Sequence, residues 1–199
     1  NRIAGSNRYR TAEEIAKTLG YSNKSYIVAS GLNMADGILA SGLAMKEEKA
    51  ILLADKGEAN LPSKAKDITI VGGAVTKEVE ETLKNQNVVS SRIEGKNRIE
   101  TAQKVADVIN KNATSYVIAN SDKPTDALTA TVLAYKTGSP LLFVNDKTEK
   151  LELPKRVKKV YLIGGVDSIK EELENQLIKE INPSIEDRFI EAIKDTENN

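Results

Sequence analysis

Asn7-Arg8-Tyr9-Arg10-Thr11-Ala12 recurs 90 residues later as Asn97-Arg98-Ile99-Glu100-Thr101-Ala102. The frame begins once more at Asp187-Arg188-Phe189, again 90 residues further on and followed by Ala192. This period is much longer than the roughly 20–50 residues of a solenoid unit. The repetition therefore predicts copied domains, each large enough to enclose much of its own core.

Other landmarks keep the same order and nearly the same spacing. Arg2-Ile3-Ala4-Gly5 corresponds to Arg92-Ile93-Glu94-Gly95, and Tyr26-Ile27-Val28-Ala29 corresponds to Tyr116-Val117-Ile118-Ala119. The pairs Gly72-Gly73 and Gly164-Gly165 are 92 residues apart, so the second copy has gained two residues. We therefore predict one repeat over residues 1–90, a second over 91–182, and the start of a truncated third over 183–199.

Composition is that of a globular protein. The 199 residues are 40% hydrophobic and 29% charged, and no apolar run is long enough to cross a bilayer. The chain begins at Asn1 and ends in a polar tail, so we expect it to be a piece of a longer protein whose signal peptide, if any, would not be visible here. It has no Cys or His, which excludes disulfides and thiolate or imidazole metal sites.

Within one copy, strands and helices are predicted to alternate. Thr11 and Glu14 form a capping-box pattern before a helix that ends at Gly20. The remaining expected elements are strands at 25–29, 50–54 and 67–71 and helices at 35–46 and 76–83. The strands are apolar along their whole length, which favours a parallel sheet with helices on both faces. We predict an α/β fold of tandem, pseudo-symmetric, Rossmann-like three-layer domains.

The Gly-Gly turns and two aspartates are candidate site residues. Gly72, Gly73, Gly164 and Gly165 follow strands and precede helices, with Thr76 or Ser168 as expected N-caps. Their amides could face an anion, although the turns lack a complete nucleotide-binding motif, so a structural turn and an anion site are both open. Asp36 and Asp126 open helices and could be caps, first-turn carboxylates, or ligand or interface groups. Asn33 and Thr125 are alternative caps.

Arg8, Arg98 and Arg188 keep their place while the residues beside them vary. A retained guanidinium suggests a bidentate partner, either a carboxylate of the same molecule, including Asp36 or Asp126, or an anionic ligand. Arg2 and Arg92 carry the same two interpretations. The basic run Lys155-Arg156-Lys158-Lys159 is consistent with a solvated surface. With 29 basic and 29 acidic residues, no long-range field favours nucleic acid or anionic lipid, so polyanion binding would have to be local.

The opening motif, Arg-Ile-x-Gly-x-Asn-Arg-[Tyr/Ile]-x-Thr-Ala at 2–12 and 92–102, resembles the type 2 cell-wall-binding repeat family of Gram-positive, notably clostridial, surface proteins. The resemblance implies a non-catalytic anchor: three tandem α/β copies around a pseudo-threefold axis that hold a secreted, S-layer-associated protein to the cell wall through an anionic secondary polymer. This sequence departs from the pattern where Ile99 and Glu100 replace Tyr9 and Arg10, and where the third copy stops soon after Arg188.

Two other functions remain as alternatives. Proteins with such repeats are often labelled N-acetylmuramoyl-L-alanine amidases or autolysins, but a zinc amidase needs His ligands that this segment lacks, so catalysis is expected elsewhere. A Rossmann-like small-anion or nucleotide binder is the second. We expect no cofactor, metal, nucleic acid or membrane insertion, and self-association through the face that a third copy would cover. The polymer-binding or repeat-interface candidates are Arg2, Arg8, Arg92, Arg98, Arg188, Asp36 and Asp126.

Overall fold

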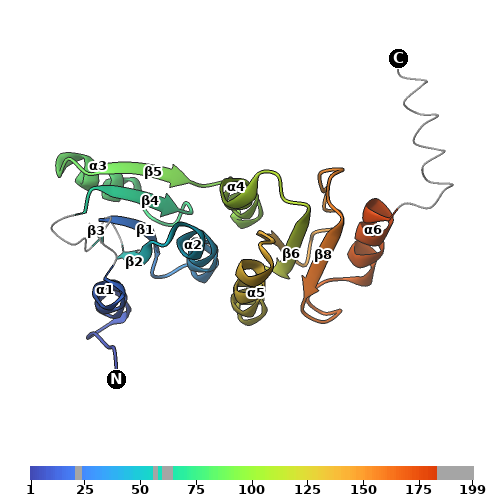
Figure 1. Cartoon of the computed structure of the whole chain (residues 1–199), viewed down its shortest axis with the longest axis horizontal. Helices are drawn as coiled ribbons and strands as arrows, with labels where there is room; N and C mark the ends of the chain where they lie inside the picture. Colours follow the sequence, from blue (N-terminus) through green and yellow to red (C-terminus); the bar gives the residue numbers. More distant parts are fainter. Residues whose placement is uncertain (21–23, 56–57, 60–64, 183–199) are drawn as a thin grey trace, which may run out of the picture.

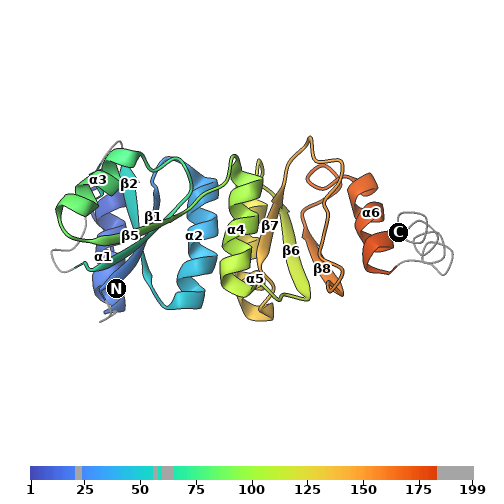
Figure 2. The same ribbon diagram turned by 90° about the horizontal axis from the view of Figure 1, so that it is seen from above.

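Two sheets, one in each repeat, lie on either side of a layer of helices (Figures 1 and 2). The computed structural model describes residues 1–20, 24–55, 58–59 and 65–182. The expected third copy, including Arg188, falls outside the described residues.

The first repeat builds a five-stranded sheet. Its elements are α1 (Arg8–Leu19), β1 (Ser25–Ser30), α2 (Met34–Glu47), β2 (Ala50–Asp55), β3 (Glu58–Ala59), β4 (Asp67–Val71), α3 (Lys77–Asn85) and β5 (Val89–Ile93). The strand order is β3-β2-β1-β4-β5, and every pair is parallel except the short β2–β3 pair. The predicted strand–helix alternation does not hold after β2, which is followed by β3 and not by a helix.

The second repeat copies this order with a smaller sheet. Its elements are α4 (Arg98–Asn110), β6 (Ser115–Asn120), α5 (Pro124–Thr137), β7 (Leu141–Val144), β8 (Lys159–Ile163) and α6 (Glu171–Ile181). The strands lie in the order β7-β6-β8 and all are parallel. The predicted class, an α/β fold of pseudo-symmetric repeats with mainly parallel sheets, is confirmed.

Helix starts follow side-chain capping, but not always at the predicted residue. The side chain of Asn7 accepts a hydrogen bond from the Arg10 amide, and α1 begins at Arg8. The predicted helix start at the Thr11 capping box, three residues later, is therefore wrong. Asn97 repeats this cap for α4. Asn33 caps α2 as one of the predicted alternatives, whereas Thr125 does not cap α5, which begins with Pro124 at its first position.

Apolar strands are explained by burial on both faces of the sheet. In β1, Ile27 and Ala29 face a core shared with α2, while Val28 faces a second core formed with α1 and α3. Successive side chains of a strand point to opposite faces, so a strand covered on both sides is apolar throughout. The second sheet has the same arrangement, with Tyr116 and Ile118 packed on the α6 side.

The seam between the repeats is made by one helix of the first repeat, α2, which packs against α4 and α5 of the second. Ile38 of α2 is 3% exposed in this seam, but its counterpart Leu128 on α5 is 53% exposed. On the other partner, Val105 of α4 is 2% exposed, whereas its counterpart Ile15 on α1 is 44% exposed. The described chain therefore leaves two faces uncovered, the α5 face of the second repeat and the α1 face of the first, although the matching faces of α2 and α4 are buried in the seam.

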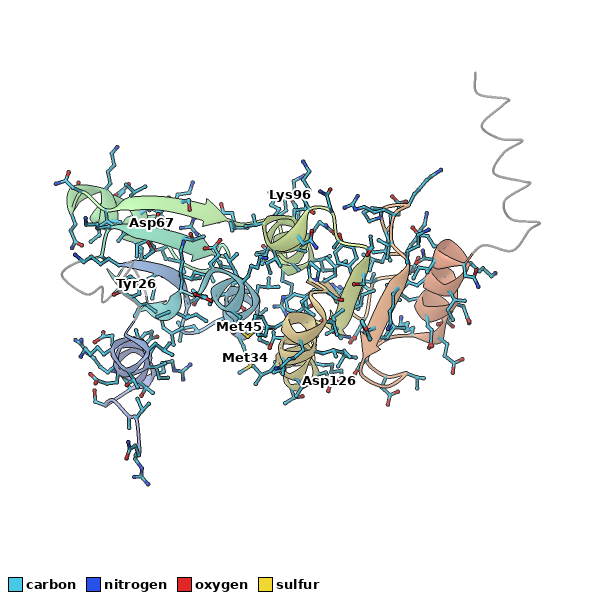
Figure 3. The ribbon with its side chains drawn as sticks, viewed as in Figure 1. Tyr26, Met34, Met45, Asp67, Lys96 and Asp126 are labelled. Atoms are coloured by element: carbon cyan, nitrogen blue, oxygen red, sulfur yellow. The ribbon has the colours of Figure 1, made fainter. Side chains whose placement is uncertain are left out.

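A cavity in the seam and the matching groove of the first repeat also differ in whether a helix covers them. A cavity of about 310 Å³ lies within the seam, lined by residues such as Val105, Ile109 and Leu141, and closed over by α2. The corresponding groove of the first repeat, about 420 Å³ and lined by Ile15, Leu19 and Ile51, lies between α1 and α2. Figure 3 marks Met45, which lines this groove, on α2. Among the described residues, no further helix covers it in the way that α2 covers the seam cavity.

The chain enters the second repeat through a strand of the first sheet. β5 pairs with β4 in parallel, from Asp67 opposite Val89 to Val71 opposite Ile93. The boundary that we predict between residues 90 and 91 falls within this strand. The opening Arg-Ile of the repeat motif at 92–93 therefore belongs spatially to the preceding sheet.

Candidate functional site

In the first repeat, a carboxylate of the chain fills the Gly-Gly turn. Asp36, in the first turn of α2, lies so close to Gly72 that a Cβ there would be 2.1 Å from the Asp36 Cγ. Gly72 also has a φ of +89°, which favours glycine. The amide of Ala74 donates a hydrogen bond to the Asp36 carboxylate. The Asp36 carboxylate therefore occupies the place at this turn where an anionic ligand was considered.

The second repeat forms the same contact with different donors. Asp126 lies on α5 (Figure 3), and its Oδ2 would be 3.0 Å from a Cβ at Gly164. Ser168 Oγ donates to Asp126 Oδ2 over 3.1 Å. Ser168 is therefore not the N-cap that the sequence predicts, because α6 begins at Glu171 after Lys170. Gly73 and Gly165 lie next to these turns without an equally close contact.

Arg8 and Arg98 perform one local task in both repeats. Arg8 Nη1 donates to the carbonyl of Gly31 over 2.6 Å, and Arg98 Nη1 donates to the carbonyl of Ser121 over 3.1 Å. Both carbonyls follow the central strand of their sheet. Arg98 also pairs with Asp122 Oδ1 at 2.8 Å, so the carboxylate it contacts is neither Asp36 nor Asp126 as hypothesised. In the first repeat the place of Asp122 is taken by Leu32, which is exposed.

Arg92 is held more firmly than its counterpart. Its Nε donates to Glu80 and its Nη1 to the Gly72 carbonyl over 2.7 Å, and the side chain is 11% exposed. It therefore connects β5, α3 and the Gly72 turn. Arg2, the matching residue of the first repeat, is exposed. The structure thus brings Arg92, Gly72 and Asp36 together, whereas Arg8 contacts Gly31 and Arg2 is exposed.

Asp36 sits in an electrostatically unusual place. The residue is 3% exposed, and its Oδ2 has no hydrogen-bond partner among the described residues. Burial raises the pKa of this carboxyl, against the opposing effects of the Ala74 amide and of the Arg98 and Arg92 guanidinium groups. In the folded protein the neutral form of Asp36 therefore persists to a higher pH than that of an aspartate in water.

This pKa shift predicts a pH dependence of stability. Below the ordinary value of 3.8, both folded and unfolded states bind the proton. As pH rises through that value the unfolded state loses it first, so the free energy of unfolding falls until pH passes the raised folded pKa. We expect Asp36→Asn to remove this decline in urea unfolding measured from pH 3 to 7. Asp107→Asn, at an exposed position, is the control and should keep the decline in the free energy of unfolding. If Asp36→Asn also kept the wild-type decline, Asp36 would not be its cause.

Sequence reasoning missed the residues that follow β6. Asn120 is fully buried, and its Nδ2 donates to Asp146 Oδ1 and to the Ser168 carbonyl, each over 2.8 Å. Its Oδ1 accepts the amide of Asp122. Asn120 takes the place of Ser30 in the first repeat, so the departure from the repeat was the signal that could have found it.

A family described as "cell wall binding domain 2 (CWB2)" matches residues 2–80 and 92–174, one stretch in each repeat. The chain belongs to the CWB2 family. The predicted family is thereby confirmed, and with it the expectation that this segment is a binding domain and not itself an enzyme. CWB2 membership associates the chain with the cell surface.

Curated relatives and solved structures agree with this membership. The chain is 30% identical over 190 residues to the N-acetylmuramoyl-L-alanine amidase LytC of Bacillus subtilis (strain 168), covering 88% of this chain and 38% of the amidase. It is 31% identical over 186 residues to the amidase enhancer of the same organism, covering 90% of this chain and 26% of that protein. Cwp6 from Clostridium difficile superimposes with a TM-score of 0.76 at 28% identity, covering 89% of this chain and 31% of Cwp6. Cwp8 gives 0.74 at 25% identity, covering 92% and 34%.

The chain therefore spans well under half the length of each of these proteins. Any catalysis would lie outside the part that matches. Among the described residues, no helix has the length and apolar character needed to cross a bilayer. None of their His, Cys, Asp and Glu side chains gather in groups of three or more that could hold a metal ion.

Proposed function

We propose that the chain anchors a secreted surface protein noncovalently to the Gram-positive cell wall by binding an anionic secondary polymer. The observation that carries this proposal is the CWB2 match in both repeats. Arg8 and Arg98 support it locally, because each leaves part of an exposed guanidinium beside a loop at the carboxyl edge of its sheet. Acidic groups of a repeating polymer could meet one such arginine in each repeat, and several weak contacts would add through multivalency.

The candidate residues divide by exposure. Arg2, Arg8 and Arg98 are accessible to a polymer, whereas Arg92, Asp36 and Asp126 are engaged in contacts within or between elements. We assign the exposed arginines to polymer binding and the engaged residues to the architecture of the turns and of the repeat junction. Arg188 keeps its sequence-based assignment to the third copy. The basic run at 155–159 is a weaker candidate, since Arg156 donates to the carbonyls of Ala113 and Lys111.

Co-sedimentation with purified Gram-positive walls tests the proposal. We expect the chain to pellet with intact walls, to remain in solution after acid extraction of the secondary polymer, and to bind less as salt rises. Pelleting that survives extraction would indicate that the ligand is peptidoglycan. It would favour the second candidate function, part of an amidase or autolysin whose catalysis lies elsewhere, which the similarity to LytC supports. A third candidate, a small-anion or nucleotide binder, loses support because Asp36 and Asp126 fill the glycine turns.

Replacing Arg8 and Arg98 together by Ala should weaken wall binding at least tenfold, whereas Lys155→Ala with Lys158→Ala should have a small effect. The double arginine variant removes one contact from each repeat, and multivalent binding multiplies such losses. Arg10→Ala is the matched control, because Arg10 is an exposed arginine of the same helix that pairs only locally with Glu13. Equal losses in all three variants would indicate diffuse electrostatics, and urea unfolding checks that each variant remains folded.

We also propose that the uncovered seam faces bind a neighbouring repeat or another copy of the chain. Leu128, Val132 and Tyr135 of α5 are exposed apolar residues on one such face. Covering them would bury apolar surface as the seam does. Sedimentation equilibrium is expected to show concentration-dependent association that Val132→Asp reduces and Val108→Asp, at an exposed position of α4, does not. A monomer at all concentrations would rule out association between copies.

A further inference from the structure

The second repeat has a crevice that the polymer-binding proposal does not use. It has a volume of about 330 Å³ and lies between the end of β7 with the loop after it, residues 144–148, and the loop after β8, residues 166–170. The central strand β6 lies between β7 and β8 (Figure 2). In parallel α/β sheets, ligands bind in the crevice outside the carboxyl ends of the strands, where the chain changes direction across the sheet. The position and size are those of a small-molecule site.

The walls of this crevice are fixed before any ligand arrives. Asn120, at the end of β6 and fully buried, donates to Asp146 in one wall and to the Ser168 carbonyl in the other, each over 2.8 Å. Within the first wall, the Asn145 amide donates to Thr148 Oγ1 over 3.0 Å. One buried amide therefore ties both loops to the sheet, and a ligand would meet a preformed site at little cost in ordering.

The lining combines carboxylates with an apolar surface. Asp146 and Asp167 are exposed carboxylates in opposite walls; Lys170 is the one cation among the lining residues, and Lys147 is exposed next to Asp146. Val166 is 59% exposed at the rim, and Ile169 and Leu173 close the inner side. Carboxylate oxygens accept hydrogen bonds from hydroxyl groups, and the aliphatic side chains suit the C–H face of a sugar ring.

The local charge disfavours an acidic ligand. The first turn of α6 beside the crevice carries Glu171, Glu172 and Glu174. Together with Asp146 and Asp167, these side chains outnumber the two lysines of the same loops, Lys147 and Lys170, and give the crevice an excess of negative charge. An anionic group would be repelled here, whereas a neutral polyol would not be.

Two residues at this crevice differ from their counterparts in the first repeat. By the spacing of the Gly-Gly turns, Asp167 corresponds to Val75, which is 2% exposed in the core of the first repeat. Asn120 corresponds to Ser30. The second repeat thus has a carboxylate and a buried amide where the first has an apolar side chain and a hydroxyl.

We propose that this crevice binds a neutral sugar unit through its hydroxyl groups, with Asp146 and Asp167 as acceptors. The site deepens the proposed wall binding: it rests on that function for the origin of the sugar, but not for the binding itself. A glycan would then be held by two chemistries, acidic groups at the exposed arginines and an uncharged sugar in the crevice.

Titration of the ¹⁵N-labelled chain tests this site, with glucose, mannose, N-acetylglucosamine and N-acetylmannosamine as probes, in the presence of EDTA. At least one sugar is expected to shift the amides of 145–148 and 166–170 saturably, with millimolar affinity. Asp167→Val, which copies the first repeat, should weaken this binding at least tenfold. Asp107→Ala, an exposed carboxylate of α4, should leave it unchanged.

Three results would overturn the proposal: no saturable shift with any of the four sugars, equal weakening by Asp107→Ala, or inorganic phosphate displacing the sugar at the same amides. Shifts of these amides by fragments of extracted wall polymer would identify the wall as the source, and shifts by free sugars alone would identify a soluble ligand. If the chain fails to pellet with walls but still binds a sugar here, only the anchoring proposal fails.

Discussion

Replacing Ile38 by aspartate is expected to lower the free energy of unfolding by about 3–5 kcal/mol, while the same replacement at Leu128 should change it by less than about 0.5 kcal/mol. The two residues occupy the same position of the repeat. Ile38 is 3% exposed against the second repeat, so an aspartate there would be a charge with no partner in a seam lined by apolar side chains. Leu128 is 53% exposed, so its replacement would remain in water.

Chemical denaturation followed by circular dichroism measures both effects in the same chain. The pair is internally matched, because helix position, replacement and repeat context are equivalent. The loss at Ile38 is a large part of the roughly 5–15 kcal/mol that holds a typical domain together, so partial separation of the repeats before global unfolding is also expected. Similar losses at Ile38 and Leu128 would mean that the seam contributes little to stability, or that α5 is covered in solution by an associated copy.

Gly72→Ala should destabilise the protein by more than about 2 kcal/mol. An alanine at this position would have to adopt a φ of +89°, and its Cβ would lie 2.1 Å from the Asp36 Cγ. Asp36 is short and buried, so it cannot move aside without losing its hydrogen bond from the Ala74 amide. The substitution therefore strains the backbone and disconnects the turn from α2 at the same time.

Gly37→Ala is the control for this substitution and should stabilise the protein by about 0.5–1 kcal/mol. Gly37 is helical, a Cβ there would meet nothing within 4 Å, and the second repeat already has Ala127 at the matching position. Thermal unfolding of the two variants should thus move the midpoint in opposite directions. A neutral Gly72→Ala would show that Asp36 does not hold the turn in place.

The fold could be predicted largely because the sequence is duplicated. A strand or helix that is ambiguous in one copy is supported by its counterpart, and apolar strands favour a sheet buried on both faces. Local capping was harder to predict. Thr11 satisfies a sequence pattern, but Asn7 reaches the Arg10 amide and starts the helix earlier, so Thr11 bonds instead to Gly5 and Asn7. A capping pattern shows that a helix begins nearby without fixing the residue.

The candidate site could be predicted only in part, because its contacts join residues far apart in the chain. Repetition identified Arg98 and Asp36 as retained positions, but not their partners. Arg98 pairs with Asp122, which no repeated motif contains, and Asp36 packs against Gly72, which the sheet topology brings into place. Conversely, attention to what is repeated hid Asn120 and Asp167, which distinguish the second copy from the first.

The sharing of β5 has a consequence for dissecting the protein. A polypeptide cut after residue 90 would lose most of the strand that pairs with β4, and would bare a sheet edge containing Ile68 and Ile70. Bare edges of this kind invite aggregation between chains. A cut after residue 95 would instead leave the first sheet whole and transfer to it the first four residues of the second copy's opening motif, 92–95. The sequence repeat and the folding unit of this chain are therefore out of phase by one strand. A protease or a recombination event would have to cut at the boundary of the folding unit, after β5, to leave either half intact.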